Sequence, residues 1–255
     1  MVLARLRMPA LAVVIGAAAV ALPLLGLAAP AQAAAGANGG GRGFTSARPF
    51  APSVINNLDF AGYAAAVAPG SATSAAAQFK VPRLSCTAAD RSIAPEVLVA
   101  VNNFRSESSA YLFVVCHRGR AFYFPALDIN GNEVNYAITS VRAGDVIKIS
   151  AKVTTRATTV QVTDVTRRVT KRRTGAGARP SAVLVGDDSV FLNTTRLGVP
   201  NFGTLTFTSC LVNGRALARS HPVRDQRVNS RGILQIATGA LSPAGTAFAT
   251  HYRHF

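Results

Sequence analysis

The sequence predicts an all-β protein, an antiparallel two-sheet β-sandwich of the jelly-roll type. Short runs rich in Val, Ile, Thr, Phe and Tyr recur between turn residues, which is the pattern of β-strands. Helical periodicity is nearly absent after about residue 33. Ten or more short strands within about 200 residues are typical of a sandwich or jelly roll.

Each predicted strand rests on one such run. The clearest is Val146–Val153, in which Ile147, Ile149 and Ala151 share one face. Asn130-Gly131 is a hairpin turn signal after the run Arg120–Phe124. In chain order the predicted strands are Ala75–Val81, Val97–Asn102, Ala110–Cys116, Arg120–Phe124, Val146–Val153, Thr158–Thr166, Ser181–Gly186, Thr204–Ser209 and Thr246–Tyr252.

The N-terminus carries the features of a secretory signal peptide over residues 1–33. Arg5 and Arg7 precede an apolar stretch, and Ala31-Gln32-Ala33 is a small-x-small cleavage site. We expect a secreted protein, extracellular or associated with the cell wall, with no membrane contact after cleavage; the alternative is an uncleaved anchor. Residues 34–56 are rich in Gly, Ala and Pro and predict a flexible linker, and residues 57–255 form one domain.

The chain is strongly basic. It has 27 Lys and Arg against 11 Asp and Glu, a formal charge of +16, which becomes about +14 without Arg5 and Arg7. Such a charge favours anionic polymers, although a generally basic surface without a dedicated partner is the simpler interpretation. The dense run Arg167–Arg173 is predicted at a strand end that enters a flexible loop, Thr174–Pro180. It is too short and too poor in aromatic residues for a nucleic-acid motif, and the sequence says nothing of oligomeric state.

Three cysteines remain in a chain that we expect to be exported, which suggests one disulfide and one leftover thiol. We predict a Cys86–Cys116 disulfide with Cys210 free; the alternative is three buried thiols. The histidines are scattered and no C-x-x-C occurs, so we expect neither a metal site nor a cofactor.

Seven blocks, in order, resemble the bacterial branch of the glutamic peptidases, or eqolisins. The resemblance implies a concanavalin-type sandwich, in agreement with the strand pattern. The blocks are Asn57–Tyr63, Phe79–Pro82, Val97–Phe104, Val141–Asp145, Thr163–Thr166, Asn201–Phe207 and Leu241–Phe248.

The resemblance also implies a peptidase mechanism that this chain lacks. In that family a Glu acts as general base on water and a Gln amide stabilises the oxyanion, and the matching positions here are Val183 and Phe113. Such groups contribute about 10²–10⁴ and about 10²–10³ in rate. A shift of the alignment by one residue recovers neither. We therefore expect no catalytic residue, with Phe113 and Val183 close together in an apolar groove that also holds Tyr111, Val115 and Val185.

Three functions follow as expectations. The first is an inactive peptidase-like protein that acts as a binding or structural sandwich. The second is an active endopeptidase with relocated residues, for which Asp128 and Asp187 are weak candidates; Asp187-Asp188 is otherwise predicted to be a solvated turn. The third is a basic binding module for anionic cell-wall polymer or carbohydrate. Two adjacent polar groups on the floor of the groove would favour the second.

Overall fold

The computed structural model describes residues 54–68, 70–101, 106–136, 141–192 and 195–253. The predicted signal peptide, residues 34–53 of the predicted linker, and His254 lie outside the described residues. The first strand, β1 (Val54–Asn57), already includes the last three linker positions. Among the described residues the one helical segment is a 3-10 turn, Leu217–Ser220, so the all-β prediction is confirmed.

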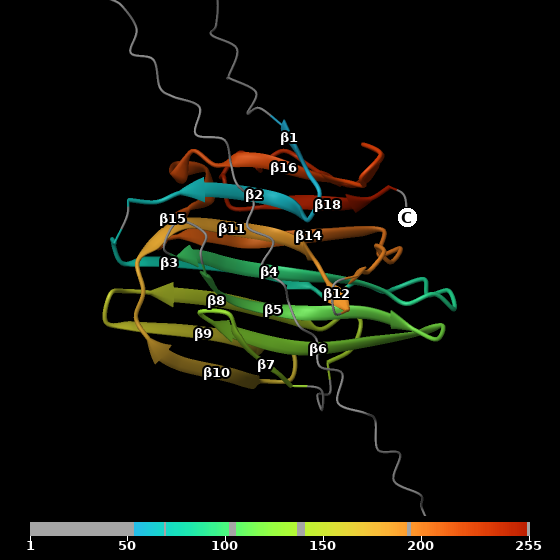
Figure 1. Ribbon diagram of the computed structural model, residues 1–255, viewed down its shortest axis with the longest axis horizontal. Helices are drawn as coiled ribbons and strands as arrows, with labels where there is room; N and C mark the ends of the chain where they lie inside the picture. Colours follow the sequence, from blue (N-terminus) through green and yellow to red (C-terminus); the bar gives the residue numbers. More distant parts are fainter. Residues whose placement is uncertain (1–53, 69, 102–105, 137–140, 193–194, 254–255) are drawn as a thin grey trace, which may run out of the picture.

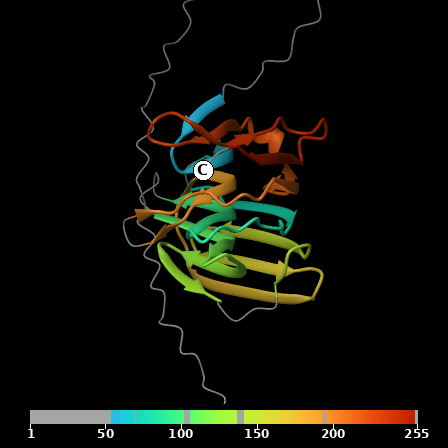
Figure 2. The same ribbon diagram turned by 90° about the vertical axis from the view of Figure 1, so that its right-hand side faces the viewer.

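The strands form two layers of a sandwich (Figures 1 and 2). In hydrogen-bonding order the front layer contains β16 (Val223–Val228), β2 (Phe60–Ala66), β11 (Pro180–Ser189), β4 (Arg91–Val101), β5 (Ser106–His117), β6 (Arg120–Ile129) and β7 (Asn132–Asn135). The back layer contains β10 (Val169–Ala176), β9 (Ala157–Asp164), β8 (Val146–Val153), β3 (Thr73–Lys80), β14 (Thr204–Val212), β18 (Phe248–Tyr252) and β17 (Leu234–Thr238).

Smaller pairings complete the sheet. β17 pairs with β16 and so joins the two layers. β1 runs parallel to β16, and β15 (Arg215–Ala216) pairs with β14. β12 (Phe191–Leu192) and β13 (Thr195–Arg196) form a separate two-stranded ribbon. All the other pairs in the main sheet are antiparallel.

The main hydrophobic core lies between the layers. β4 and β5 pack across it against β8 and β9. Because strand side chains alternate between faces, alternate residues of β2, β4, β5, β6 and β11 enter this core, as Val97 and Val99 do on β4. The remaining residues of the front strands point away from the back layer, and we call the surface they form the outer face.

The alternation prediction is confirmed for β8, whose bounds are Val146–Val153 and whose residues Ile147, Ile149 and Ala151 are buried. The Asn-Gly hairpin is also confirmed. Asn130 and Gly131 connect β6 to β7 with φ angles of 55° and 79°. Two consecutive positive φ values are those of a type I′ turn.

The prediction for the basic run is wrong in its second half. Arg167 and Arg168 lie in a turn, but β10 then continues to Ala176, through residues predicted to be loop. Thr159 and Thr163 on β9 contact Thr174 and Thr170 on β10 through their hydroxyl groups, at 3.4 and 3.1 Å. Such cross-strand pairs stabilise a strand that the charged side chains alone do not predict.

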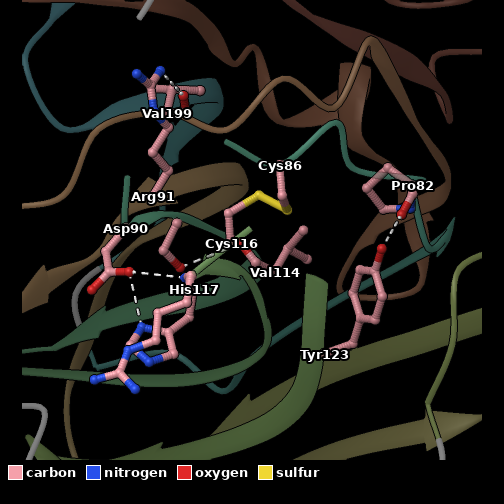
Figure 3. Close-up of a disulfide and its surroundings, with 11 residues drawn as sticks. Pro82, Cys86, Asp90, Arg91, Val114, Cys116, His117, Tyr123 and Val199 are labelled. Carbon is pink, nitrogen blue, oxygen red and sulfur yellow. Dashed lines mark hydrogen bonds and ion pairs between the residues drawn. A yellow bond between two sulfur atoms is a disulfide. The ribbon is translucent and has the colours of Figure 1, made fainter. Parts of the chain in front are cut away.

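The Cys86–Cys116 disulfide is present, with the two Cα atoms 5.4 Å apart (Figure 3). It ties the segment before β4 to the end of β5. Cys210, on β14, is buried and free, as predicted. Near the disulfide, Asp90 accepts from His117 at 2.9 Å and the Tyr123 hydroxyl donates to the Pro82 carbonyl at 3.0 Å (Figure 3).

Candidate functional site

The predicted groove residues do not share one surface. Tyr111 and Phe113 lie on the outer face, and Val115 packs against the same cluster, whereas Val183 and Val185 point into the core between the layers. The register separates them further. Val183 lies beside Val99, which lies beside Ser108 on β5, five residues from Phe113. At about 3.3 Å per residue this is roughly 16 Å along the strand.

The prediction that Phe113 and Val183 meet in one groove is therefore wrong. The physical reason is that Ala182–Val185 is a continuous apolar run. Such a run has no alternation of polar and apolar residues that would show which side chains lie on which face. On β11 the residues that reach the outer face are Ala182 and Leu184, which form an apolar patch with Leu98 and Ala100. Neither Ala182 nor Leu184 carries a carboxyl group.

Asp187 and Asp188 are not a solvated turn, contrary to the prediction. Both lie within β11. Asp187 is fully buried in the interior, where it accepts a hydrogen bond from the Thr250 hydroxyl of β18. Burial raises the pKa of Asp187 to about 7. Asp188 points to the outer face and is half-buried.

Asp128, the other rescue candidate, lies on the outer face and is 4% exposed. It accepts a hydrogen bond from the Gly131 amide at 2.7 Å. Its neighbours in register are Ser109 on β5 and Glu133 on β7.

Five carboxyl groups gather on this outer face, and we call them the carboxyl cluster: Glu96, Glu107, Asp128, Glu133 and Asp188. Glu96 is at its centre, directly beside Tyr111 on β5 and Gly186 on β11. Side chains directly opposite each other on neighbouring strands have Cβ atoms about 4.5–5.5 Å apart. The Tyr111 hydroxyl in turn donates to Glu133. The outer face therefore does hold adjacent polar groups.

Burial and mutual repulsion change the acidity of the carboxyl cluster. Burial, followed by the charges of Asp188, Glu107, Asp128 and Asp187, raises the pKa of Glu96 well above its usual value. Burial likewise raises the pKa of Glu107 to about 8, of Asp188 to about 7 and of Asp128 to about 6, and it raises that of Glu133. These groups thus hold protons at a pH at which ordinary carboxyl groups are ionised.

Aromatic rings enclose Glu96 on both sides. On one side are Tyr111 and Phe113, whose ring centroids are 5.1 Å apart. On the other side the Phe60 ring lies over the paired residues Gly62 and Gly186: a Cβ atom added to either glycine would come within 2.8 Å of this ring. The two glycines therefore allow Phe60 to lie against the backbone beside Glu96.

Basic groups reach only the margins of the carboxyl cluster. Arg227, 1% exposed, faces Asp188 and Asp187, and burial lowers the pKa of its guanidinium to about 10. Arg173 lowers the pKa of Asp128 by its charge, against the larger effect of burial. No described basic group lowers the pKa of Glu96 or Glu107. Burial and the charges of neighbouring carboxyl groups are the causes of their shifts.

The described residues offer no alternative site of comparable chemistry. Among them, no group of three or more His, Cys, Asp or Glu side chains is arranged to hold a metal ion. A hollow of about 580 Å³ lies elsewhere, between Ser106, Asn130, Thr155, Gly177, Ala178 and Arg179. It has no acidic side chain in its lining, so we place the candidate site at the carboxyl cluster.

Sequence reasoning missed most of this site. Glu96, Glu107, Glu133 and Asp188 were not recognised as site residues. One local signal was available, since Glu96 is a single charged residue between Pro95 and the apolar run Val97–Val101. A charged residue inside a buried strand is a candidate functional residue, because its burial is costly without a compensating role.

Comparisons with known proteins agree with the fold. The chain resembles the crystal structure of scytalido-glutamic peptidase with a transition-state analogue inhibitor, at 14% identity and a TM-score of 0.59, over 77% of this chain and 100% of that one. SCP-B, an eqolisin in complex with the tripeptide Ala-Ile-His, gives 15% identity and a TM-score of 0.57 over 77% and 100%.

Aspergilloglutamic peptidase from Aspergillus niger gives 14% identity and a TM-score of 0.54 over 64% of this chain and 99% of that one. At these identities the structures show the fold alone. No curated protein matches the sequence. Among the described residues there is no helix with the length and apolar character needed to cross a membrane. The profile of the Peptidase A4 family, in contrast, matches residues 59–229, and the chain therefore belongs to the Peptidase A4 family.

Proposed function

We propose that this chain is a secreted, non-catalytic member of the Peptidase A4 family that binds peptides on the outer face of its front layer. The observation that carries the proposal is the apolar patch of Leu98, Ala100, Ala182 and Leu184, in which Leu184 is half-buried and the other three are 5% exposed or less. It occupies the outer-face positions on either side of Val183, the residue that matches the family's catalytic glutamate. A site without a base at this point can hold a substrate but cannot activate water there.

Two observations support the other parts of the proposal. The signal-peptide pattern of residues 1–33 and the Cys86–Cys116 disulfide both fit an oxidising, extracellular environment. Two structural neighbours were solved with a peptide-based transition-state analogue and with a tripeptide. The same fold therefore accommodates peptides in related proteins, and an apolar patch beside polar groups is a suitable surface for one.

Isothermal titration of blocked tripeptides into the full chain tests this function. We expect saturable binding, with peptides recovered uncut. The variant Leu184→Asp, which places a charge in the apolar patch, should weaken binding about tenfold or more. The matched control is Leu211→Asp, which makes the same substitution at a half-buried residue of β14 in the back layer. Equal binding by wild type and Leu184→Asp would refute the role of the patch.

A second candidate function is acid hydrolysis by relocated carboxyl groups, because Glu96 and Asp188 lie diagonally across β4 and β11 on one face. Two carboxyl groups that repel each other titrate apart, so that one is ionised while the other keeps its proton. The ionised member would take a proton from water as it attacks a carbonyl, and the protonated member would give one to the leaving amine.

This second candidate makes a different prediction for two variants. If it holds, Glu96→Gln and Asp188→Asn each lower kcat by about a hundredfold or more, while Asp90→Asn, at an exposed turn near Cys116, leaves kcat unchanged. Absence of activity in the wild type decides for the non-catalytic function.

A further inference from the structure

The floor of the carboxyl cluster contains polar atoms that the protein leaves without partners. Glu96 is 3% exposed and its Oε1 accepts no hydrogen bond from the described residues. Ser109, on the same face and beside Asp128, is fully buried, and its hydroxyl also lacks a partner there. Buried polar groups are nearly always hydrogen-bonded in native proteins, so two unsatisfied groups in one site suggest that a ligand completes them.

The charge of the site is opposite to that of the chain. The protein has 27 Lys and Arg and a formal charge of +16, yet five of its 11 acidic residues form the carboxyl cluster. None of the described basic groups acts on the pKa values of Glu96 and Glu107. The basic groups at the margins act on Asp188 and Asp128, but Glu96 and Glu107 have no cation of their own among the described residues. This part of the network is incomplete, and a cation from outside would complete it.

The surroundings of Glu96 suit an organic cation. Tyr111 is directly opposite Glu96, and the Phe60 ring lies over the glycine pair on the other side. Aromatic faces attract ammonium and guanidinium groups, above all where water is excluded. The apolar patch begins next to this point, since Leu98 and Leu184 are two residues along β4 and β11 from Glu96 and Gly186. A Lys or Arg side chain buries its methylene stem on such a surface.

We propose that the carboxyl cluster recognises the ammonium or guanidinium group of a Lys or Arg side chain in a bound peptide. The stem of that side chain lies on the apolar patch and the charged end reaches Glu96 and Asp188. This inference rests on the proposed peptide-binding function and names its ligand class. The same cationic chemistry occurs in free amines such as agmatine, and the experiment separates these two sources.

Binding of a cation has a proton signature. An ionised carboxylate is the form that pairs with a cation, and the raised pKa values, about 8 for Glu107 and about 7 for Asp188, mean that protons must leave first. Affinity therefore rises from pH 5 to pH 8, and binding releases protons. The titratable and charged groups that act on Glu96 or its carboxyl neighbours come from several elements. They are Asp59 before β2, Glu107 and Tyr111 on β5, Asp128 on β6, Glu133 on β7, Arg173 on β10, Asp187 and Asp188 on β11, Arg196 on β13 and Arg227 on β16.

Titration calorimetry of the full chain tests the proposal. The probes are acetyl-Ala-Arg-Ala-amide, the same peptide with citrulline in place of Arg, the same peptide with norleucine, and agmatine. At pH 8 we expect the Arg peptide to bind about tenfold or more tighter than the citrulline peptide. Repeating the titration in buffers of different ionisation enthalpy should show that protons are released.

Two variants make the test specific. Glu96→Gln keeps the shape and hydrogen-bonding capacity of the side chain but removes its charge, and it should lower the affinity for the Arg peptide about tenfold. Asp90→Asn removes one charge from an exposed position near the disulfide and should leave the affinity unchanged. Circular dichroism of both variants at pH 8 confirms that each is folded.

Each outcome decides something. Binding of all three peptides with equal affinity overturns the cation site but leaves peptide binding intact. Binding of agmatine without any peptide supports the cation site and overturns the peptide as its source. An affinity for the Arg peptide that Glu96→Gln does not change, or that falls from pH 5 to pH 8, refutes the assignment, and no binding of any probe refutes both proposals.

Discussion

At the scale of single residues, Glu96 determines the character of the outer face. Its neighbours in register are Tyr111 and Gly186, and the other members of the carboxyl cluster share its face. The cost of burying this charge is met by protonation, which is why its pKa is raised. The same residue is central to the hydrolase and cation hypotheses, and it is therefore the most informative position to change.

Glu96→Gln should stabilise the protein at pH 8 and leave it unchanged at pH 4. In the folded chain the pKa of Glu96 lies above its unfolded value of about 4.5. Above that pH, ionisation of this residue lowers the free energy of the unfolded wild type more than that of the folded wild type. The wild type therefore loses stability as pH rises, and the Glu96→Gln variant, which has no proton to lose here, does not. We expect a Tm increase of about 2–4 °C at pH 8, the shift that roughly 1 kcal/mol produces in a domain of this size.

Thermal unfolding followed by circular dichroism measures this difference. Asp90→Asn, which removes an exposed carboxyl group paired with His117, is the control and should change Tm little at either pH. A lower Tm for Glu96→Gln at pH 8 would mean that the ionised glutamate has a stabilising partner, against the present account.

At the scale of elements, the sequence predicted strands where side chains alternate and failed where they do not. β8 was predicted to its bounds because Ile147, Ile149 and Ala151 alternate with polar residues. β2 was missed because Phe60–Ala66 is rich in alanine and glycine and lacks β-branched residues. Asp187 was assigned to a turn because two adjacent acids favour solvent, whereas pairing with β2 and β4 continues the strand through them.

The site was harder to predict than the strands because register decides it. Glu96, Tyr111 and Asp188 are 15 and 77 residues apart along the chain, and only the pairing of β4 with β5 and β11 brings them to one face. A family alignment gives positions along each strand but not the face that each side chain occupies, which is how Phe113 and Val183 were wrongly placed together.

The Cys86–Cys116 disulfide should contribute measurably to stability. It closes a loop with a sequence separation of 30 residues, for which loop-closure entropy gives about 3–4 kcal/mol. The double variant Cys86→Ala with Cys116→Ala should lower the free energy of unfolding by about this amount, measured by urea denaturation at pH 5.

Cys210 provides the matched control for that measurement. It is buried and unpaired, so Cys210→Ala removes only a small buried side chain and should cost about 1 kcal/mol. An equal loss in the single and double variants would show that the disulfide adds nothing to stability beyond packing.

At the scale of the whole molecule, the protein combines a basic chain with a buried acidic face. In the charge balance of the fold, seven carboxyl groups have raised pKa values: Glu96, Glu107, Asp128, Glu133, Asp187, Asp188 and Asp225. Only Asp145, held by Arg167 at 2.8 Å, has a clearly lowered pKa among the described carboxyl groups. The pH dependence of folding follows from this imbalance.

The free energy of unfolding should fall as pH rises from about 4 to about 8. A carboxyl group with a raised pKa binds more protons when folded, so its ionisation in that window favours the unfolded state. Below pH 4 stability should also fall, as Asp145 is protonated. As carboxyl groups ionise, the net positive charge falls and the surface arginines repel one another less, which favours the folded state. Salt at 0.15 M screens this repulsion. Urea denaturation from pH 3 to pH 9 at this salt concentration measures the curve, and a stability maximum near pH 8 would contradict the raised pKa values.

Cleavage of denatured protein substrates by the purified full chain, from pH 2 to pH 7, tests the central claim most directly. We expect background rates throughout, because Val183 and Phe113, the residues proposed to match the family's Glu and Gln, carry neither a base nor an amide. The carboxyl groups on the same face as Phe113, Glu96 among them, are proposed to bind a cation rather than to act on water. Acid-dependent cleavage that follows the protein through purification and disappears in Glu96→Gln would contradict it and would assign catalysis to the carboxyl cluster.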